Sequence, residues 1–202
     1  MKIICIGRNY ADHAKEMNAP LPDAPVFFMK PDTALLLPGS PFYIPDFTSD
    51  LHYECELVIK IRKVGKNIPE KFAADYYDEI ALGIDFTARD LQTKCKEKGL
   101  PWEIGKSFDN SAPIGRFISK ENLNLANLAF TLTKNGAIVQ SGHTTDMIFT
   151  PDQLISYVSK FITLKTGDLL FTGTPAGVGP VAIGDRLEAF IGEEKSLDLE
   201  IK

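Results

Sequence analysis

The amino-acid sequence predicts a strand-rich mixed α+β fold. Short apolar and β-branched segments recur along the chain, helical patterns are few, and the two do not alternate as strand–helix–strand units. The length of 202 residues is that of one large domain or two small ones, and the hydrophobic content of 44% is ordinary for a globular protein. We therefore expect a single domain over residues 1–202.

The first half of the chain alternates strands and helices with proline-rich loops. Strands are predicted at 2–6, 26–29, 56–62 and 79–86, and helices at 9–17, 70–77 and 89–98. The segments 18–25 and 31–49 are rich in proline, so we expect loops there. Gly99 directly follows the third helix and is typical of a helix C-terminus.

The last third of the chain is mostly β. Its strands are predicted at 128–134, 137–140, 169–172 and 186–191. Asn135-Gly136 lies between the first two and is the strongest short hairpin signal. A helix is expected to begin with Thr150 as N-cap, Pro151 at N1 and Gln153 at N3. It should run to about residue 162 and bury one face, formed by Leu154, Tyr157, Val158 and Phe161.

Charge and cysteine content exclude several classes of protein. The net charge of −5 lacks the positive field that nucleic-acid binding needs. The three cysteines are odd in number and widely spaced, which argues against a disulfide scaffold or a thiolate zinc site and fits a reducing compartment. The apolar runs are too short to span a bilayer, and the N-terminus lacks a signal peptide pattern. We expect a cytoplasmic protein without membrane or nucleic-acid partners.

Two acidic groups point to a metal site. Glu54 and Glu56 are two residues apart at the start of a predicted strand, so their side chains share a face. Asp85 ends another apolar strand, where an unpartnered charge is costly. Together the three carboxylates form an all-oxygen set of the kind that Mg²⁺ or Mn²⁺ prefers. The alternatives are a solvated strand edge for the glutamates and a helix N-cap for Asp85, in competition with Thr87.

Three further motifs carry polar groups suited to catalysis or substrate binding. His13 and Glu16 are one helical turn apart, a spacing at which a carboxylate can orient an imidazole as a general base, although many such pairs lie on surfaces. Arg89 and Gln92 are similarly spaced. Lys106 lies in an apolar stretch and can reach an anionic substrate, with an ordinary surface lysine as the alternative.

A glycine-rich turn over residues 172–179 matches neither a P-loop nor a dinucleotide-binding fingerprint. Its amides and hydroxyls, including that of Thr174, could bind a carboxylate. The helical segment 94–98 is interpreted as a solvated helix face, and His143 as part of a variable loop.

These motifs occur in an order that resembles the fumarylacetoacetate hydrolase superfamily. The matching segments are GRNYADH-x-x-E, FFMKP, H-x-E-x-E-L, D-x-T-A-R-D-x-Q, GLPW-x-x-x-KSFD, MIF-x-x-x-x-L-I-x-Y-x-S and GD-x-x-x-TGTP-x-GVGP. The resemblance covers essentially the whole chain and is strongest to the short single-domain branch of acylpyruvases and oxaloacetate decarboxylases. It implies a strand-rich mixed β-roll with a few peripheral helices, a homodimer and, because no targeting segment is visible, a bacterial cytosolic member.

The resemblance also implies roles for individual residues. Glu54, Glu56 and Asp85 match the metal ligands of the family for Mg²⁺ or Mn²⁺, and Lys106 matches its active-site lysine. His13 and Glu16 match a lid dyad that activates water. The positions that match contacts to the substrate carboxylate are Arg89, Gln92 and Thr174.

The implied substrate is a small 2-keto acid. We expect a metal-dependent enzyme that hydrolyses the C–C bond of 2,4-diketo acids such as acetylpyruvate or fumarylpyruvate, with possible decarboxylation of oxaloacetate. The alternatives are a 2-keto acid isomerase, decarboxylase or hydratase of aromatic catabolism, or a metal-binding protein without catalytic activity. The His13–Glu16 pair favours hydrolysis among these.

Overall fold

A six-stranded mixed sheet is the largest sheet of the computed structural model, which describes residues 1–17 and 20–202. Its strands in spatial order are β2 (Val26–Lys30), β1 (Ile3–Gly7), β12 (Leu169–Phe171), β5 (Cys55–Ile61), β6 (Tyr77–Ile84) and β9 (Ile118–Ser119). β1 runs parallel to β12, and the other neighbours are antiparallel. β5 and β6 are buried on both faces, so they read as apolar runs without strict alternation.

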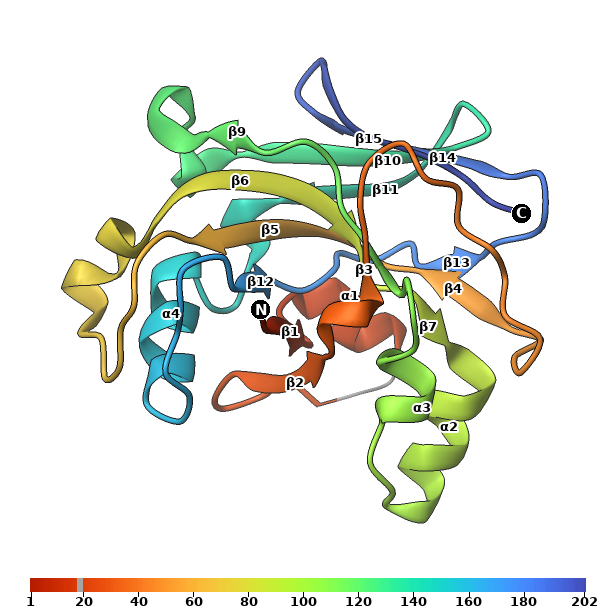
Figure 1. Cartoon of the computed structure of the whole chain (residues 1–202), viewed down its shortest axis with the longest axis horizontal. Coiled ribbons are helices and arrows are strands. Elements are labelled where there is room, and N and C mark those ends of the chain that lie inside the picture. The colour runs from red at the N-terminus through yellow and green to blue at the C-terminus, as the bar shows by residue number, and fades with distance from the viewer. Residues whose placement is uncertain (18–19) are drawn as a thin grey trace.

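A four-stranded antiparallel sheet lies above β5 and β6 in the view of Figure 1. Its strands in spatial order are β11 (Ala137–His143), β10 (Ala129–Lys134), β14 (Arg186–Ile191) and β15 (Glu194–Glu200). β14 and β15 contact β6, and apolar side chains of both sheets belong to one core cluster. The predicted hairpin between β10 and β11 is confirmed: Asn135 and Gly136 have φ of 54° and 81°, the positive values of a type I′ turn.

Two small sheets complete the β structure of the described residues. β4 (Leu51–Tyr53) pairs with β13 (Gly179–Pro180) on one side and with β7 (Thr87–Ala88) on the other. β3 (Leu35–Leu36) runs parallel to β8 (Ala112–Pro113). The β4 pairings matter most for function, because they draw together three segments that are far apart in the sequence.

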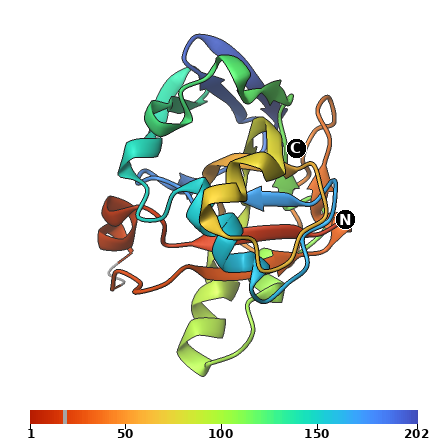
Figure 2. The same ribbon diagram turned by 90° about the vertical axis from the view of Figure 1, so that its left-hand side faces the viewer.

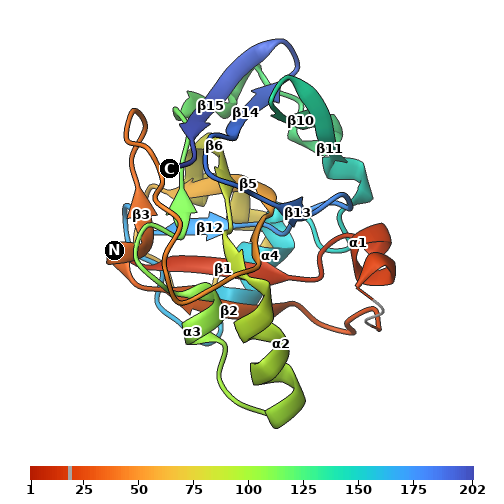
Figure 3. The ribbon, with the colours of Figure 1, turned by 90° about the vertical axis from the view of Figure 1, so that its right-hand side faces the viewer.

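The helices lie around the sheets rather than between strands of a parallel sheet. α1 (Ala11–Glu16), α2 (Arg89–Lys98) and α3 (Glu103–Lys106) lie near β1 and β2 in Figure 3. α4 (Pro151–Ser159) lies on the opposite side of the molecule from α2 and α3 (Figure 1) and packs against a 3₁₀ helix (Glu70–Tyr76). This pair of helices faces the viewer in Figure 2. The predicted strand-rich α+β class with peripheral helices is therefore confirmed.

Two predicted helices differ from the structure. The segment 70–77 forms a 3₁₀ helix, the geometry that short connectors commonly take, and leads directly into β6. α4 begins with the predicted capping box of Thr150 and Gln153 but ends at Ser159, not at residue 162. Phe161 lies beyond the helix end and is 59% exposed, so it is not part of the buried face. Leu154 and Val158 are buried as predicted, together with Ile155, and Tyr157 is only partly buried.

Other expectations are met with small shifts of boundary. α2 has the predicted limits, and Gly99 after it adopts the left-handed conformation of a C-terminal cap with φ of 63°. The predicted loop over 18–25 begins with Asn18 and Ala19, which lie outside the described residues. The three cysteines are buried and unbridged. None of the helices described here has the length and apolar character needed to cross a membrane.

Candidate metal centre and active site

Three buried carboxylates meet where β4, β5 and β6 come together. Glu54 and Glu56 flank the first residue of β5, and Asp85 follows β6, its antiparallel neighbour. The register pairs Cys55 with Ile84, and the amide of Asp85 donates a hydrogen bond to the carbonyl of Glu54 at 2.8 Å. Each carboxylate offers an oxygen atom within 4.8 Å of the other two.

Burial decides between the alternatives for these acids. Glu54, Glu56 and Asp85 are only 5%, 1% and 1% exposed, so the solvated strand edge is wrong. The N-cap of α2 is Ala88, without a side-chain cap, and Asp85 therefore does not cap this helix. Nor does Thr87, whose hydroxyl donates to the carbonyl of Asp85 at 3.2 Å.

Two cations compensate Glu54. The Lys106 ammonium lies 2.7 Å from Oε2 of Glu54 and 2.7 Å from Oδ2 of Asp85. The Arg89 guanidinium lies 2.5 Å from Oε1 of Glu54. Burial by itself would raise the pKa of Glu54, but Lys106 and Arg89 outweigh it and hold that pKa well below its usual range. Lys106 is 3% exposed, so it is not the surface lysine of the alternative interpretation.

Glu56 has a different environment. Among the described residues it forms no ion pair, and one carboxylate oxygen accepts the amide hydrogen of Gly173 at 2.7 Å. Burial and then the charges of Asp85 and Glu54 raise the pKa of Glu56. A divalent cation between the three carboxylates would remove this repulsion. The donor set, all oxygen and all buried, therefore fits Mg²⁺ or Mn²⁺.

Lys30 is a buried cation of this site that our sequence analysis did not single out. Its ammonium lies 2.8 Å from Oδ1 of Asp85 and donates to Oγ and the carbonyl of Ser111 at 2.9 and 3.1 Å. It also donates to the carbonyls of Phe86, at 3.3 Å, and of Lys106. The sequence feature that could have identified Lys30 is its position at the end of an apolar strand, in the segment FFMKP.

Replacing Lys30 with methionine should lower the free energy of unfolding by about 3–5 kcal/mol, the usual cost of breaking one side of a buried ion pair. The change leaves Asp85 with one cation fewer and removes a donor from three carbonyl groups. Those of Ser111 and Lys106 keep a second donor, the amide of Phe86 and the hydroxyl of Ser111, and that of Phe86 loses the one donor found for it among the described residues. Urea denaturation of the metal-free protein measures this loss. Lys60→Met is the matched control, because Lys60 is a partly exposed lysine paired with Glu79. A loss for Lys30→Met no larger than for the control would contradict the prediction.

The dyad on α1 is formed as predicted. His13 Nδ1 lies 3.1 Å from Oε2 of Glu16, and His13 is 8% exposed. The amide of Gly177 donates to both oxygens of Glu16, at 3.1 and 3.3 Å. Asn9, just before the helix, donates to the carbonyls of Phe149 and Thr172 at 2.9 and 2.8 Å. The last third of the chain therefore fixes where α1 starts and how its dyad is oriented.

The glycine-rich turn binds carboxylates through its amides, as its sequence indicated, but the carboxylates belong to this chain. Two of its amides, those of Gly173 and Gly177, bind carboxylates of this chain, Glu56 and Glu16. The hydroxyl of Thr174 donates to the carbonyl of Cys55 at 2.9 Å. The turn thus positions the candidate metal ligand and the dyad, and these two amides are occupied by protein carboxylates rather than open to a substrate.

α2 and α3 hold the remaining candidate residues together. Arg89 Nη1 donates to Oε1 of Gln92 at 2.8 Å, as their spacing indicated. α3, which carries Lys106, packs tightly on α2 through Gly105. A Cβ atom at Gly105 would lie 2.9 Å from the backbone nitrogen of Gln92, closer than packed atoms approach. Only glycine at position 105 lets the two helices approach this closely.

A small cavity of about 50 Å³ collects these groups. It is lined by eight of the nine candidate residues: His13, Glu54, Glu56, Asp85, Arg89, Gln92, Lys106 and Thr174. Glu16 is absent from the lining but contacts His13. Val26, Phe28 and Trp102 supply an apolar part of the wall. Metal-ligand, cationic and general-base candidates therefore line one cavity.

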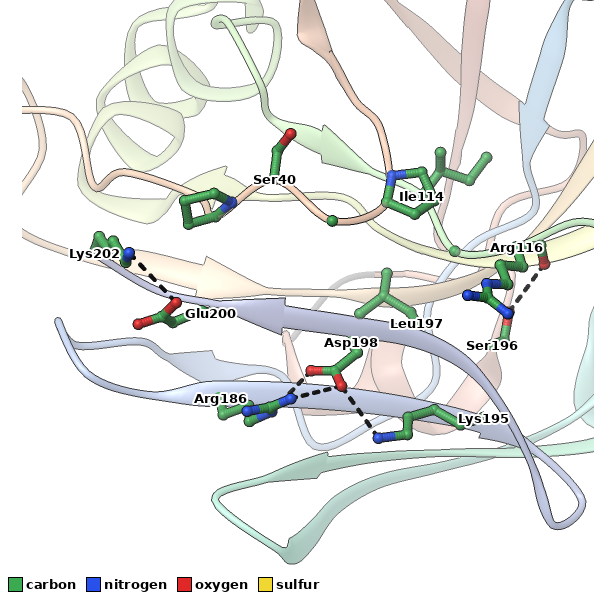
Figure 4. A pocket seen from close by; sticks show the side chains of 14 residues that line it. Ser40, Ile114, Arg116, Arg186, Lys195, Ser196, Leu197, Asp198, Glu200 and Lys202 are labelled. Atoms are coloured by element: carbon green, nitrogen blue, oxygen red, sulfur yellow. Dashed lines mark hydrogen bonds and ion pairs between the residues drawn. The ribbon is translucent and has the colours of Figure 1, made fainter.

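A larger cavity lies elsewhere in the described part of the chain. It has a volume of about 760 Å³ and runs along β15 (Figure 4). Arg186 and Lys195 both point to Asp198 there, at 2.7 and 3.1 Å, and Lys195 also pairs with Glu188 at 2.7 Å, so the two cations are compensated by two carboxylates (Figure 4). None of the candidate site residues lines this cavity. His143 is also remote from the chemistry, with its ring bonded locally to Thr145 at 2.6 Å.

The family model described as "Fumarylacetoacetate (FAA) hydrolase C-terminal" matches residues 2–201. The chain belongs to this family. Its relatives in the fumarylacetoacetate hydrolase family include the mouse oxaloacetate tautomerase FAHD1, mitochondrial, which is 47% identical over 99% of this chain and 91% of that protein. The oxaloacetate decarboxylase, mitochondrial, of Dictyostelium discoideum is 45% identical over 94% of this chain and 88% of its own length.

Solved structures of the same family match the fold closely. Fumarylpyruvate hydrolase from Pseudomonas aeruginosa, in complex with Mn²⁺ and pyruvate, superposes with a TM-score of 0.94 and 40% identity, covering 100% of this chain and 89% of that one. A fumarylacetoacetate hydrolase family protein from Yersinia pestis gives 0.95 and 41%, covering 100% and 93%. The resemblance read from the sequence, to a short single-domain member of this family, is thereby confirmed.

Proposed function

We propose that this protein is a Mg²⁺- or Mn²⁺-dependent enzyme that hydrolyses 2,4-diketo acids to pyruvate and a carboxylic acid, and that also decarboxylates oxaloacetate. The observation that carries the proposal is the position of the His13–Glu16 dyad, which lies at the cavity that the three carboxylates line. Its relatives, which include a fumarylpyruvate hydrolase and an oxaloacetate decarboxylase, support it.

The metal requirement follows from the donor set. Glu54, Glu56 and Asp85 would hold the cation, and when bound it would act as a Lewis acid toward the 2-keto acid end of the substrate. Arg89 and Gln92 line the same cavity and would orient the substrate carboxylate. The proposal assigns the opposite, acyl end of the substrate to the side of the cavity lined by His13.

Hydrolysis needs a base and a cation. His13, oriented by Glu16, would take a proton from water, and the resulting hydroxide would attack C4 of the diketo acid. The C3–C4 bond then breaks, the acyl group leaves as a carboxylic acid, and the electron pair forms the enolate of pyruvate. Lys106 would stabilise the charge on the enolate oxygen, and the proton held by His13 returns to C3.

Oxaloacetate decarboxylation would use only part of this machinery. Its keto acid end is identical, and loss of CO₂ in place of an acyl group leaves the same pyruvate enolate. No water attacks, so this reaction depends on the carboxylates and Lys106 but not on His13 as a base. The two reactions therefore separate the role of the dyad from the role of the metal centre.

Tautomerisation of oxaloacetate is a second candidate. The mammalian relatives carry this activity in their names, and the reaction moves a proton between C3 and the 2-oxygen without breaking a C–C bond. The same cavity supplies His13 as a proton carrier. This activity can coexist with the other two, because all three reactions share the enol form of a 2-keto acid.

A substrate panel tests the proposal. Steady-state rates are measured on acetylpyruvate, fumarylpyruvate and oxaloacetate, with Mg²⁺, with Mn²⁺ and after treatment with EDTA. We expect metal-dependent formation of pyruvate from all three. Pyruvate formation that persists at full rate after removal of metal would overturn the metal assignment. Interconversion of the oxaloacetate tautomers without any pyruvate would favour the second candidate over the first.

A further inference from the structure

Gln140 is a buried polar residue of β11 that has no role in the chemistry proposed above. It belongs to the four-stranded sheet and is only 2% exposed. Its side-chain amide makes three hydrogen bonds, all to residues outside that sheet. Oε1 accepts the amide hydrogen of Cys55 at 2.9 Å. Nε2 donates to Oγ1 of Thr174 and to the carbonyl of Pro175, both at 2.9 Å. One side chain therefore joins β11 to the start of β5 and to the glycine-rich turn.

The start of β5 lies beyond the end of its neighbouring strand. β12 ends at Phe171, which pairs with Val58 of β5. At Cys55, closer to the start of β5, two side chains bind the backbone in place of that strand. Gln140 binds the amide of Cys55, and the hydroxyl of Thr174 donates to its carbonyl at 2.9 Å. Buried backbone groups are costly to leave unpaired, so these two side chains complete the strand.

This part of the chain carries two of the three candidate metal ligands. Glu54 and Glu56 are the direct neighbours of Cys55, and all three residues are buried. A rotation of the backbone at Cys55 would turn both carboxylates, because each is one peptide bond away. β6 holds the segment through the amide of Asp85, which donates to the carbonyl of Glu54. Gln140 adds a second restraint, and this one comes from the other sheet.

The glycine-rich turn packs directly on the backbone of β11 at the same place. A Cβ atom at Gly177 would lie 2.3 Å from the carbonyl oxygen of Val139, the residue before Gln140, so a larger residue does not fit there. The amide of Gly177 binds Glu16 of the dyad. β11 therefore supports the turn twice, through this close contact and through the two hydrogen bonds that Gln140 donates.

We propose that Gln140 is a positioning residue, which holds the Cys55 peptide and the glycine-rich turn so that the two glutamates keep the orientation needed to bind a divalent cation. Gln140 is not among the described residues that line the cavity, so it acts through its hydrogen-bond partners. Residues that orient metal ligands in this way usually contribute strongly to metal affinity. The inference rests on the proposed function and makes β11 of the second sheet part of its metal centre.

Metal titration tests the proposal without a substrate. Gln140→Met keeps the length of the side chain and removes the amide, and we expect it to weaken Mn²⁺ binding by about 10- to 100-fold in electron paramagnetic resonance. Ser159→Ala is the matched control. It also removes a buried hydrogen bond, from the amide of Ile68 at 2.9 Å, but Ser159 does not line the cavity and its loss should leave Mn²⁺ affinity unchanged. Wild-type affinity in a folded Gln140→Met protein would overturn the proposal.

Amide hydrogen exchange reports on the positioned peptide itself. In the metal-free protein, followed by nuclear magnetic resonance, Gln140→Met should speed exchange of the Cys55 amide at least about tenfold more than that of Val58, further along β5. A general loss of stability would speed both amides by the same factor, and that result would overturn a local positioning role. If Gln140→Met does not fold, Thr174→Val removes the neighbouring bond to Cys55, and wild-type Mn²⁺ affinity in that variant overturns the proposal.

Kinetics separate this inference from the proposed function. We expect the Mn²⁺ concentration that gives half-maximal pyruvate formation to rise in Gln140→Met by the same factor of about 10 to 100 as the dissociation constant. A wild-type protein that binds Mn²⁺ but forms no pyruvate, with weaker Mn²⁺ binding in Gln140→Met, would support the positioning role and overturn the proposed function. A wild-type protein that forms pyruvate, with unchanged Mn²⁺ affinity in Gln140→Met, would do the reverse.

Discussion

Glu54→Gln should weaken Mn²⁺ binding by more than about 100-fold, since even loss of a residue that only supports a metal ligand costs about 10- to 100-fold. Glu54 connects the cations and the carboxylates of the candidate metal centre. Lys106 and Arg89 both bind its carboxylate, and one of its oxygen atoms lies close to oxygen atoms of Glu56 and Asp85. The amide keeps the shape but removes the charge. We therefore expect pyruvate formation from acetylpyruvate and from oxaloacetate to fall together.

The measurement combines metal titration with kinetics. Mn²⁺ binding is followed by electron paramagnetic resonance, and kcat/KM is determined for both substrates at saturating metal. Glu79→Gln is the matched control, because Glu79 lies on the adjacent strand β6 in a partly exposed ion pair with Lys60 at 2.6 Å. Thermal unfolding of both variants separates a metal defect from a folding defect. Wild-type Mn²⁺ affinity in a folded Glu54→Gln protein would refute the assignment of Glu54 as a ligand.

His13→Ala should separate the two activities. We expect the rate of acylpyruvate hydrolysis to fall by about 10²- to 10⁴-fold, the usual contribution of a general base. Oxaloacetate decarboxylation should change by less than about threefold in kcat, because no water is deprotonated in that reaction. The ratio of the two rates in one preparation is the informative quantity, since errors in the active fraction of protein cancel.

Two further variants of α1 sharpen this result. Glu16→Gln keeps an acceptor for the Gly177 amide but removes the charge beside His13, so hydrolysis should fall less than in His13→Ala. Asp12→Asn, an exposed residue on the same helix, should leave both activities unchanged. Unchanged hydrolysis in His13→Ala would show that another group activates the water. An equal loss of both activities would show that His13 maintains the structure of the site and does not activate the water.

Local sequence signals predicted the secondary structure best where a specific backbone geometry was required. The predictions of a turn at Asn135-Gly136 and of a helix end at Gly99 were correct, because few residues other than glycine and asparagine tolerate a positive φ. The Thr150 cap was equally clear, because its hydroxyl satisfies an amide of the first helical turn. By contrast, β15 (Glu194–Glu200) was missed, because it is rich in charged residues and becomes a strand by pairing with β14.

Some contacts of the candidate site could be predicted from the sequence and others could not. The spacing of Glu54 and Glu56 and that of His13 and Glu16 placed each pair on one face, since these are neighbours within a single element. The sequence did not show that Lys30 reaches Asp85, because β2 and β6 are separated along the chain and by three strands of the sheet.

The amino-acid sequence by itself determined the family, the strand-rich class, and the residue types of a candidate oxygen-ligated metal centre with a candidate base nearby. Only the tertiary structure decided how the charges are distributed within it. Strand register brought Asp85 to Glu54, and the approach of α3 to α2 through Gly105 brought Lys106 between them. These long-range contacts determine which carboxylate has its charge compensated by a cation and which does not. Electrostatic energy in a buried site depends on the distances between charged atoms, and the positions of residues along the chain do not give those distances.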